Sequence, residues 1–308
     1  VLDTAISGSK EKLKHGLKVL FSKIIGDAGL AVKDIKFAIT SGMITSEIGL
    51  LEIPHLWAPV GISDLAKNLK IVQDPKIFPL DLPLIFIRGI KNYYSEEANY
   101  KDVRKMDFLR GEEAQIAGLL SLKPEIKLPT VVTVLSSHTK YIFINEEKKI
   151  SGCLTTLSGQ IYEAIKKETS IGKSIIGSTP VSNNYFNPDL VKTAYDVVQN
   201  VGFLRSLMMP RFMEVLLNTE WYERDLFINS AITAEDLKVM NDFSLFKFSP
   251  QSSHFVLIGH IQRCEILKHM LKFYYGIKDD VEIIYSKEDI ERLSIEGGIY
   301  IAREAGYF

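Results

Sequence analysis

The amino-acid sequence predicts an α/β protein made of two domains. In the first half, short apolar runs rich in β-branched residues alternate with helical segments, as they do in α/β layers with parallel strands. In the second half, three closely spaced strand runs precede a helix. The 308 residues also exceed the usual size of one domain. We therefore expect an N-terminal domain over residues 1–124 and a C-terminal domain over residues 125–308.

The first domain is expected to alternate helices with strands. Apolar residues recur at helical spacing from Ser9 to Ile25, and glycines follow that end the helix. The runs Lys36–Thr40 and Leu84–Ile87 are short and apolar, and each is followed within two residues by a glycine, so we expect buried strands there. Further helices are expected over Ser63–Ile71 and Glu112–Leu122.

The second domain is expected to open with a three-stranded antiparallel unit. Its strand runs are Val131–Leu135, Tyr141–Asn145 and Ile150–Thr155. The link between the second and third runs, residues 146–149, is polar throughout, as a hairpin tip should be. A helix over Gln160–Lys167 completes this β-β-β-α unit.

The rest of the second domain begins with a mainly helical insertion at about residues 188–242. After it, the pattern predicts a strand at Phe255–Ile258, a helix at Ile261–Tyr275, a strand at Val281–Tyr285 and a final helix from Lys287 to about residue 303. The order of elements in this half is thus β-β-β-α, helical insertion, β-α-β-α.

The amino-acid composition limits the kinds of molecule that the protein is expected to bind. With 37 basic and 38 acidic side chains, the net charge of −1 gives no overall positive field for nucleic acid or an anionic membrane. No apolar run reaches the roughly 18–20 residues that span a bilayer. The two cysteines, Cys153 and Cys264, predict buried reduced thiols in a cytoplasmic protein. The aromatic and methionine clusters of the insertion suggest either plain core or the face of a homodimer.

The first motif that carries chemistry follows the strand at Lys36–Thr40 and runs from Ser41 to Pro59. Gly42 frees the backbone to approach a ligand. Thr45 and Ser46 place hydroxyls at the carboxyl end of a strand, where ligands of α/β proteins bind. The alternative is a strand-ending loop in which these hydroxyls only cap the backbone.

The second motif is Arg110-Gly111-Glu112-Glu113, at the start of a predicted helix. Arg110 offers a fork that suits a carboxylate or phosphate. One of the two carboxylates could act as a general base or a magnesium ligand. The alternative is a pair of acids that stabilise the helix N-terminus, beside a solvated arginine.

Two further motifs lie in the second half. The turn Ser136–Lys140 offers backbone amides, hydroxyls and one cation, which together suit a phosphate. Serine-rich hairpin turns are common, so a purely structural turn is the alternative. Gly259 ends a strand directly before a helix, a junction that suits a nucleotide but is weak evidence when it rests on a single glycine.

Together these motifs resemble the signatures of the 2-dehydro-3-deoxygalactonokinase family, in the family's order and roughly its spacing. The segments that carry the resemblance are Ser41–Pro59, Arg110–Glu113, Ser137–Lys140 and Thr156–Gly159, and Val1–Glu11 is similar to a segment that follows the family's first hairpins. The β-β-β-α order likewise resembles the ribonuclease-H-like module that occurs twice in the superfamily of sugar kinases, heat-shock-70 proteins and actin. The resemblance covers nearly the whole chain.

The resemblance implies a kinase of two ribonuclease-H-like domains with an interdomain cleft, which transfers phosphate from ATP, with Mg²⁺, to the 6-hydroxyl of 2-dehydro-3-deoxy-D-galactonate. It implies that Glu113, or else Glu112, is the base. It implies the following contacts: phosphates with Ser137, His138, Thr139 and Lys140; the sugar acid with Gly42, Met43, Ser46 and either Arg110 or Arg88; the nucleotide with Gly159 and Gly259. The metal ligands stay unassigned.

The sequence departs from the family pattern at several places. Ser136, Gln160 and His260 stand where the family usually has a glycine, a glutamate and a small residue. The three opening strands of the first module, with their Asp-x-Gly phosphate loop, are not found before Ser9, and we expect the upstream gene sequence to encode them. A non-catalytic binding protein of the same superfamily, or a kinase for another 2-dehydro-3-deoxy sugar acid, are the alternative functions.

Overall fold

The computed structural model describes residues 8–178 and 185–308. Most of the Val1–Glu11 segment therefore lies outside the described residues. By its internal contacts the chain divides into two compact units. Unit 1 comprises residues 1–126, 144–153 and 288–308, and unit 2 comprises residues 127–143 and 154–287. The domain boundaries that the sequence suggests stay a prediction.

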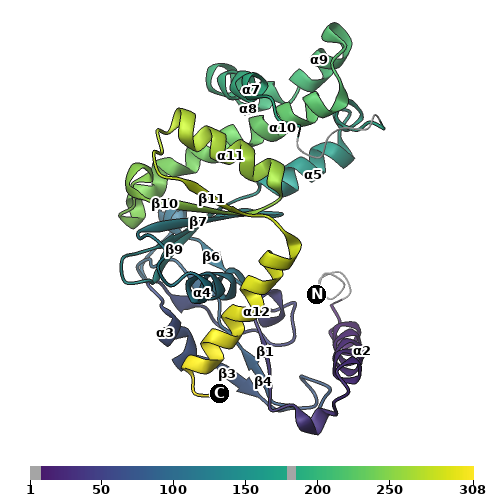
Figure 1. Cartoon of the computed structure of the whole chain (residues 1–308), viewed down its shortest axis with the longest axis vertical. Coiled ribbons are helices and arrows are strands. Elements are labelled where there is room, and N and C mark those ends of the chain that lie inside the picture. Colours follow the sequence, from purple (N-terminus) through teal and green to yellow (C-terminus); the bar gives the residue numbers. More distant parts are fainter. Residues whose placement is uncertain (1–7, 179–184) are drawn as a thin grey trace. The chain divides into compact units, whose positions relative to one another are not determined.

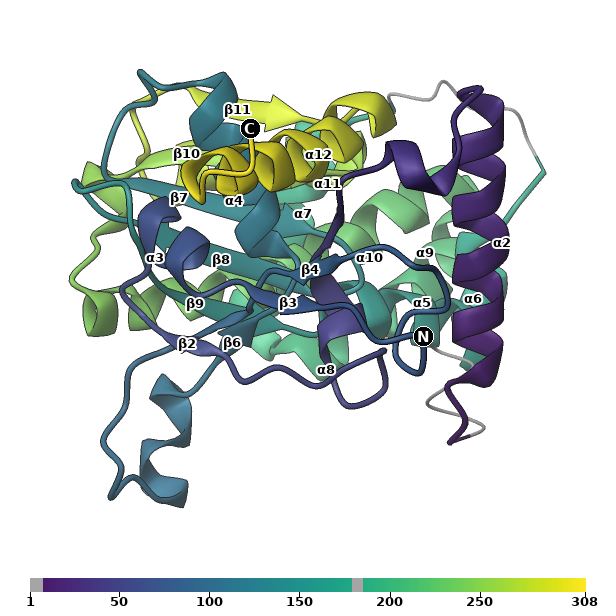
Figure 2. The ribbon, with the colours of Figure 1, turned by 90° about the horizontal axis from the view of Figure 1, so that it is seen from below.

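Unit 1 is a mixed α/β structure with two small sheets. In one sheet the central strand β4 (Leu84–Phe86) pairs parallel with β1 (Ala38–Thr40) and antiparallel with β3 (Lys70–Val72). In the other, β5 (Ile90–Lys91) pairs parallel with β2 (Leu56–Trp57) and antiparallel with β6 (Phe108–Leu109). The segment between β5 and β6, which includes the 3₁₀ helix η3 (Tyr100–Lys105), extends away from this sheet (Figure 2).

Four α-helices of unit 1 are described. They are α2 (Glu11–Asp27), α3 (Ile62–Lys67), α4 (Glu112–Leu122) and α12 (Lys287–Glu304). Helices α4 and α12 pack at very close range through glycines. A Cβ atom at Gly118 would lie 1.9 Å from the carbonyl oxygen of Leu293, and one at Gly297 would lie 1.8 Å from that of Ala114. This contact holds the helix that begins with the two candidate carboxylates.

Unit 2 contains a five-stranded sheet in the order β11-β10-β7-β8-β9. Its strands are β7 (Thr130–Leu135), β8 (Thr139–Ile144), β9 (Ile150–Thr156), β10 (His254–Gly259) and β11 (Val281–Ile284), and the tip of the β8–β9 hairpin is counted with unit 1. Strand β10 is parallel to both β7 and β11, and Gly259 lies opposite Leu135. The ends of β7 and β10 therefore meet at one edge of the sheet.

Within unit 2 the helices pack on one face of this sheet. After β9 come α5 (Ser158–Glu168), α6 (Gly172–Ile175), α7 (Pro188–Val201), α8 (Phe203–Ser206), α9 (Met209–Leu217), α10 (Trp221–Asp236), the 3₁₀ helices η4 (Leu237–Phe246) and η5 (Pro250–Ser252), and α11 (Ile261–Tyr274). Helix α11 packs on β10, and α10 packs on both α11 and α7 (Figure 1). The main core joins the sheet to these helices, with Tyr141, Phe143, Phe243 and Phe255 fully buried.

Most expected elements are confirmed, within one to three residues at their ends. One is wrong in part, because the helix expected over Ser63–Ile71 ends at Lys67 and its last residues belong to β3. The helical insertion is confirmed but is broken into separate helices. Two of the breaks fall at Gly202 and Asn218, which have φ of +86° and +50°, values that a continuing helix does not allow. The described residues contain no helix that is long and apolar enough to cross a membrane.

Candidate functional site

The loop after β1 is the first part of the candidate site in unit 1. It forms a short 3₁₀ helix, η2 (Gly42–Thr45), in which the Thr45 hydroxyl donates to the carbonyl of Gly42 at 2.9 Å. The Ser46 hydroxyl donates to the carbonyl of Met43 at 2.6 Å, while the Met43 side chain is half exposed. Both hydroxyls thus close the turn, and Met43 is the side chain that the loop offers to solvent.

Arg110 ties this loop to the start of α4. Its Nη1 atom donates to the carbonyl and hydroxyl oxygens of Thr45. Its Nη2 atom donates to the carbonyl of Ile53 at 3.1 Å and lies 3.3 Å from Nδ1 of His55. The structure therefore brings together the two motifs of unit 1, although they are separated by about 65 residues. Most of the guanidinium's donors are used in holding the loop.

A close backbone approach fixes the same place. Gly42 and Gly111 both have positive φ, +85° and +112°. A Cβ atom at Gly111 would lie 3.2 Å from the Cα atom of Gly42. An L-residue at position 111 would therefore be strained in its backbone and crowded by the facing loop. Glycine at these positions allows the loop and the N-terminus of α4 to touch.

Glu112 and Glu113 begin α4 and differ sharply in environment. The Glu112 carboxylate is half-buried and accepts a hydrogen bond from the backbone N–H of Arg110 at 2.9 Å. Glu113 is 0 % exposed, and its Oε2 atom accepts from the N–H of Gly111 at 2.6 Å. Its Oε1 atom is buried and has no hydrogen-bond partner among the described residues. Burial is the main cause that raises the pKa of Glu113 to about 8, and the nearby Glu112 charge raises it further.

Arg88 lies on the segment between β4 and β5. Its side chain is half-buried, and its Nε atom is buried with no hydrogen-bond partner among the described residues. The next residue, Gly89, packs tightly, because a Cβ atom there would lie 2.7 Å from Cδ2 of His55. His55 in turn contacts Arg110, so the segment that carries Arg88 lies beside the loop that Arg110 holds.

The candidate phosphate turn of unit 2 joins β7 to β8 at residues 136–138. The N–H of Ser136 donates to the carbonyl of His138 at 3.0 Å, and the N–H of Gln160 donates to the carbonyl of Ser137 at 2.8 Å. A Cβ atom at Gly159 would lie 2.1 Å from the Ser136 carbonyl oxygen. The predicted residues Ser137, His138 and Gly159 are thus brought together, and α5 begins directly against the turn.

Behind the turn lies a network of buried polar side chains. The hydroxyls of Thr139 and Ser158 lie 2.6 Å apart, and Ser158 donates to Oδ2 of Asp236 at 3.0 Å. Arg263 donates from Nη1 to the carbonyl of Ser136 at 2.7 Å and from Nη2 to the Thr139 hydroxyl at 3.1 Å. Burial raises the pKa of Asp236, whose Oδ1 atom has no hydrogen-bond partner in the described part of the chain.

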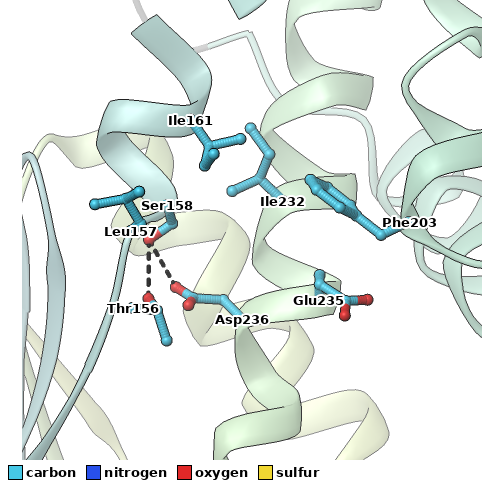
Figure 3. A pocket seen from close by; sticks show the side chains of 8 residues that line it. All are labelled: Thr156, Leu157, Ser158, Ile161, Phe203, Ile232, Glu235 and Asp236. Carbon is cyan, nitrogen blue, oxygen red and sulfur yellow. Dashed lines mark hydrogen bonds between the residues drawn. The ribbon is translucent and has the colours of Figure 1, made fainter. Parts of the chain in front are cut away.

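A pocket of about 160 Å³ borders this network (Figure 3). Its polar side consists of Thr156, Ser158 and Asp236, with the Ser158 hydroxyl between the other two side chains. The other lining residues are Leu157, Ile161, Phe203, Ile232 and Glu235. A pocket of this size is smaller than a whole nucleotide needs.

Lys140 and Gly259 complete the expected set. Lys140 Nζ donates to the Thr155 hydroxyl at 3.1 Å. Since side chains alternate along a strand, Lys140 lies on the opposite face of β8 from Thr139 and its network. Gly259 has a φ of +149°, and a Cβ atom there would lie 2.5 Å from the carbonyl oxygen of Leu135, so it packs on the end of β7.

Sequence reasoning missed Arg263 and Asp236. Arg263 lies in the first turn of α11, and its position four residues after Gly259 was an available signal. Asp236 ends α10 within the insertion, where no motif marked it. Within residues 8–178 and 185–308, no cluster of three or more histidine, cysteine or acidic side chains could hold a metal ion. Magnesium in phosphoryl-transfer sites is bound by one or two carboxylates, waters and the substrate phosphates, so such a cluster is not required.

Comparison with known proteins agrees with this picture. Residues 5–276 match the family model described as 2-keto-3-deoxy-galactonokinase. A protein from Sinorhizobium meliloti, named as a proposed 2-dehydro-3-deoxygalactonokinase, has a similar crystal structure, with a TM-score of 0.68 and 14 % sequence identity. That alignment covers 92 % of this chain and 83 % of the other, and at this identity it supports the fold alone. No curated protein sequence matches.

Proposed function

Because this chain belongs to the 2-keto-3-deoxy-galactonokinase family, we propose that it phosphorylates the 6-hydroxyl of 2-dehydro-3-deoxy-D-galactonate. The family is one of ATP-dependent carbohydrate kinases, and the chain is a sugar-acid kinase. Our proposal adds to this family assignment the identity of the acid and the hydroxyl that receives the phosphate. A cytoplasmic location, where ATP and metabolic acids meet, belongs to the same proposal.

The observation that carries the proposal is the environment of Glu113. One of its carboxylate oxygens accepts from the N–H of Gly111, which touches Gly42, and the other is buried with no hydrogen-bond partner among the described residues. A pKa of about 8 lies close to the pH of a cell, where a general base is most effective. Glu113 is thus the stronger candidate for the base, and Glu112 is occupied with a backbone contact.

In the proposed reaction, O6 of the sugar acid attacks the γ-phosphorus of ATP while the bond to the ADP oxygen breaks. The proton of the 6-hydroxyl passes to the Glu113 carboxylate, and ADP leaves with the electron pair of the broken bond. Mg²⁺, when bound, neutralises charge on the transferring phosphoryl group. The unpartnered Oε1 atom of Glu113 fits a role as a metal-water ligand as well as a base.

The substrate sites follow from the two groups of residues. We assign the sugar acid to Gly42, Met43 and Ser46, with its carboxylate at Arg88, because the donors of Arg110 are largely used within the protein. We assign the phosphates of ATP to Ser137, His138, Thr139 and Lys140, and the rest of the nucleotide to Gly159 and Gly259. Phosphoryl transfer requires the hydroxyl and the γ-phosphate to meet, so the two groups are expected to face one another in the complex with both substrates.

We propose that the chain folds as two ribonuclease-H-like domains with catalysis between them. The strand order of unit 2 supports this proposal. Strands β7, β8 and β9 follow one another in the chain and lie side by side in the sheet, and β10 and β11 extend the sheet beyond β7. Helix α5 comes after the third strand and α11 between the last two, which is the order that the sequence suggests. A homodimer stays a prediction.

A coupled ADP-release assay tests the proposed function, with the protein made from its complete gene. We expect turnover with 2-dehydro-3-deoxy-D-galactonate and one ADP per acid consumed. Glu113→Gln should lower kcat by about 10²–10⁴, the usual contribution of a general base, and the control Glu112→Gln should lower it less than tenfold. No turnover with any 2-dehydro-3-deoxy acid would instead indicate a binding protein, and faster turnover of another stereoisomer would assign a different substrate.

A further inference from the structure

The Arg263 guanidinium connects the buried polar network of unit 2 to the phosphate turn. From α10, Asp236 accepts from Ser158, Ser158 lies 2.6 Å from Thr139, and Thr139 accepts from Arg263. Arg263 then donates to the carbonyl of Ser136 in the turn. The chain of contacts therefore joins four separate elements, α10, α5, β8 and α11, to the turn.

Opposite charges stabilise the two ends of this network. The Asp236 carboxylate is buried, and Arg263 is its favourable charge partner within unit 2. A buried carboxylate and a nearby guanidinium support one another, because removal of either leaves the other charge uncompensated. The guanidinium therefore contacts both ends of the turn. Its Nη1 atom donates to the Ser136 carbonyl at the start, and its Nη2 atom donates to the Thr139 hydroxyl directly after the end.

These contacts determine where the N–H groups of the turn point. In a trans peptide the C=O and the following N–H are directed to opposite sides. The Ser136 carbonyl points to Arg263, so the N–H of Ser137 points away from it. The Ser137 carbonyl accepts from Gln160, so the N–H of His138 points away from α5. Successive N–H groups fixed in this way can bind the oxygens of a phosphate.

The turn contains no glycine. Ser136, Ser137 and His138 all carry side chains, so the conformation of the turn depends on contacts with neighbouring elements and not on the backbone freedom of glycine. Gly259 lies against the end of β7, which brings the first turn of α11 and Arg263 to the turn. The Arg263 side chain can reach the turn because β10 and β7 are parallel and end in register.

From these contacts we propose that Arg263 is a positioning residue for ATP. By holding the Ser136 carbonyl it directs the N–H of Ser137 toward the phosphates, beside the N–H of His138, which the Gln160 contact directs. The inference rests on the proposed role of the turn in binding ATP. It goes beyond that role because it makes nucleotide affinity depend on a side chain that need not touch the nucleotide.

Substitution of Arg263 tests this inference in the full-length protein. For Arg263→Ala we expect the KM for ATP to rise at least tenfold, with the KM for the sugar acid changed less than twofold. Millimolar guanidinium should restore part of the ATP affinity of this variant, since it replaces the missing group. Arg263→Lys, which retains the charge but not the forked geometry, should lie between Ala and wild type. Arg211→Ala is the matched control, because Arg211 is an exposed arginine of the same unit that pairs with Glu214.

Hydrogen exchange distinguishes a local effect on the turn from a general loss of stability. The amides of residues 136–138 should exchange faster in Arg263→Ala, while those of β10 stay protected. If both KM values are unchanged, or rise together, or if guanidinium restores nothing, Arg263 is only structural and the inference is wrong. If Arg263→Ala does not fold, the same comparison is made with Arg263→Lys.

The two proposals can fail separately. Binding of Mg·ATP, measured by calorimetry without any acid, tests Arg263 even if no sugar acid is turned over. Weaker Mg·ATP binding by Arg263→Ala, with wild-type binding by Arg211→Ala, supports the inference whatever the acceptor is. Equal Mg·ATP binding by wild type and Arg263→Ala, or none by wild type, contradicts it.

Discussion

Replacing Glu113 with glutamine should make the protein more stable than wild type at high pH. The carboxyl is 0 % exposed, and burial raises its pKa from an ordinary 4.5 to about 8. The folded protein therefore retains a proton that the unfolded chain releases above pH 4.5. Between these two pH values the unfolded state binds fewer protons than the folded state, so the free energy of unfolding falls as pH rises.

The size of the effect follows from the same values. One pH unit corresponds to about 1.4 kcal/mol, so wild type should lose about 5 kcal/mol across the whole interval if nothing rearranges. Between pH 5 and pH 7 the loss should be about 2–3 kcal/mol. Glutamine is uncharged and its oxygen can accept from the N–H of Gly111 as Glu113 does, so the variant should not show this loss.

Urea unfolding of wild type and Glu113→Gln at a series of pH values measures the difference. We expect the two proteins to be equally stable near pH 4.5 and the variant to gain steadily up to about pH 8. Glu112→Gln is the control, because it neutralises the adjacent carboxylate, which accepts from Arg110. A difference between wild type and Glu113→Gln that does not change with pH would refute the reasoning, since it would mean that Glu113 ionises as an ordinary carboxyl does.

Three further substitutions in unit 1 have expected outcomes. Arg110→Lys should lower the free energy of unfolding in urea by about 2–4 kcal/mol, because lysine cannot reproduce the forked contacts to Thr45 and Ile53. In the same variant the KM for the sugar acid should rise, with no comparable change in the KM for ATP. Gly111→Ala should cost about 1–3 kcal/mol, as a thermal melt would show, because φ is +112° and the facing loop is 3.2 Å from the new Cβ. Asn92→Ala should cost about 3 kcal/mol with both KM values unchanged, because the buried amide bonds the backbone of Cys153 twice at 2.8 Å and neither residue is a proposed substrate contact. An unaltered melting temperature in any of the three would count against the contact concerned.

Local patterns predicted most elements because local chemistry determines them. Helix α4 begins at Glu112 as expected, since a glycine precedes it and two acids follow that interact well with its N-terminus. The central strands β7 and β10 are mainly apolar and mostly buried, which is typical of strands covered on both faces. The end of α3 was predicted wrongly because Lys70 and Ile71, which were included in the helix, pair with β4 in a strand.

The small sheet of β2, β5 and β6 was not predictable. Each of these strands has only two residues, and their hydrogen bonds join segments far apart in the chain. Two residues cannot show the alternation by which a strand is recognised. Tertiary pairing, and not the local sequence, makes them strands.

The candidate site was predicted where its residues follow one another and missed where they do not. The motif at Arg110–Glu113 was found because the whole feature lies in four consecutive residues. The sequence could not distinguish Glu113 from Glu112, because the distinction depends on burial against residues elsewhere in unit 1. Arg263 and Asp236 were missed because their partners Thr139 and Ser158 lie 124 and 78 residues away.

We propose that this chain transfers phosphate from ATP to the 6-hydroxyl of a 2-dehydro-3-deoxy sugar acid. The ³¹P NMR spectrum of the product from 2-dehydro-3-deoxy-D-galactonate tests it most directly. We expect a phosphomonoester signal that is split by two neighbouring protons, because C6 is a methylene carbon. A signal split by one proton, or inorganic phosphate with no ester at all, would contradict it.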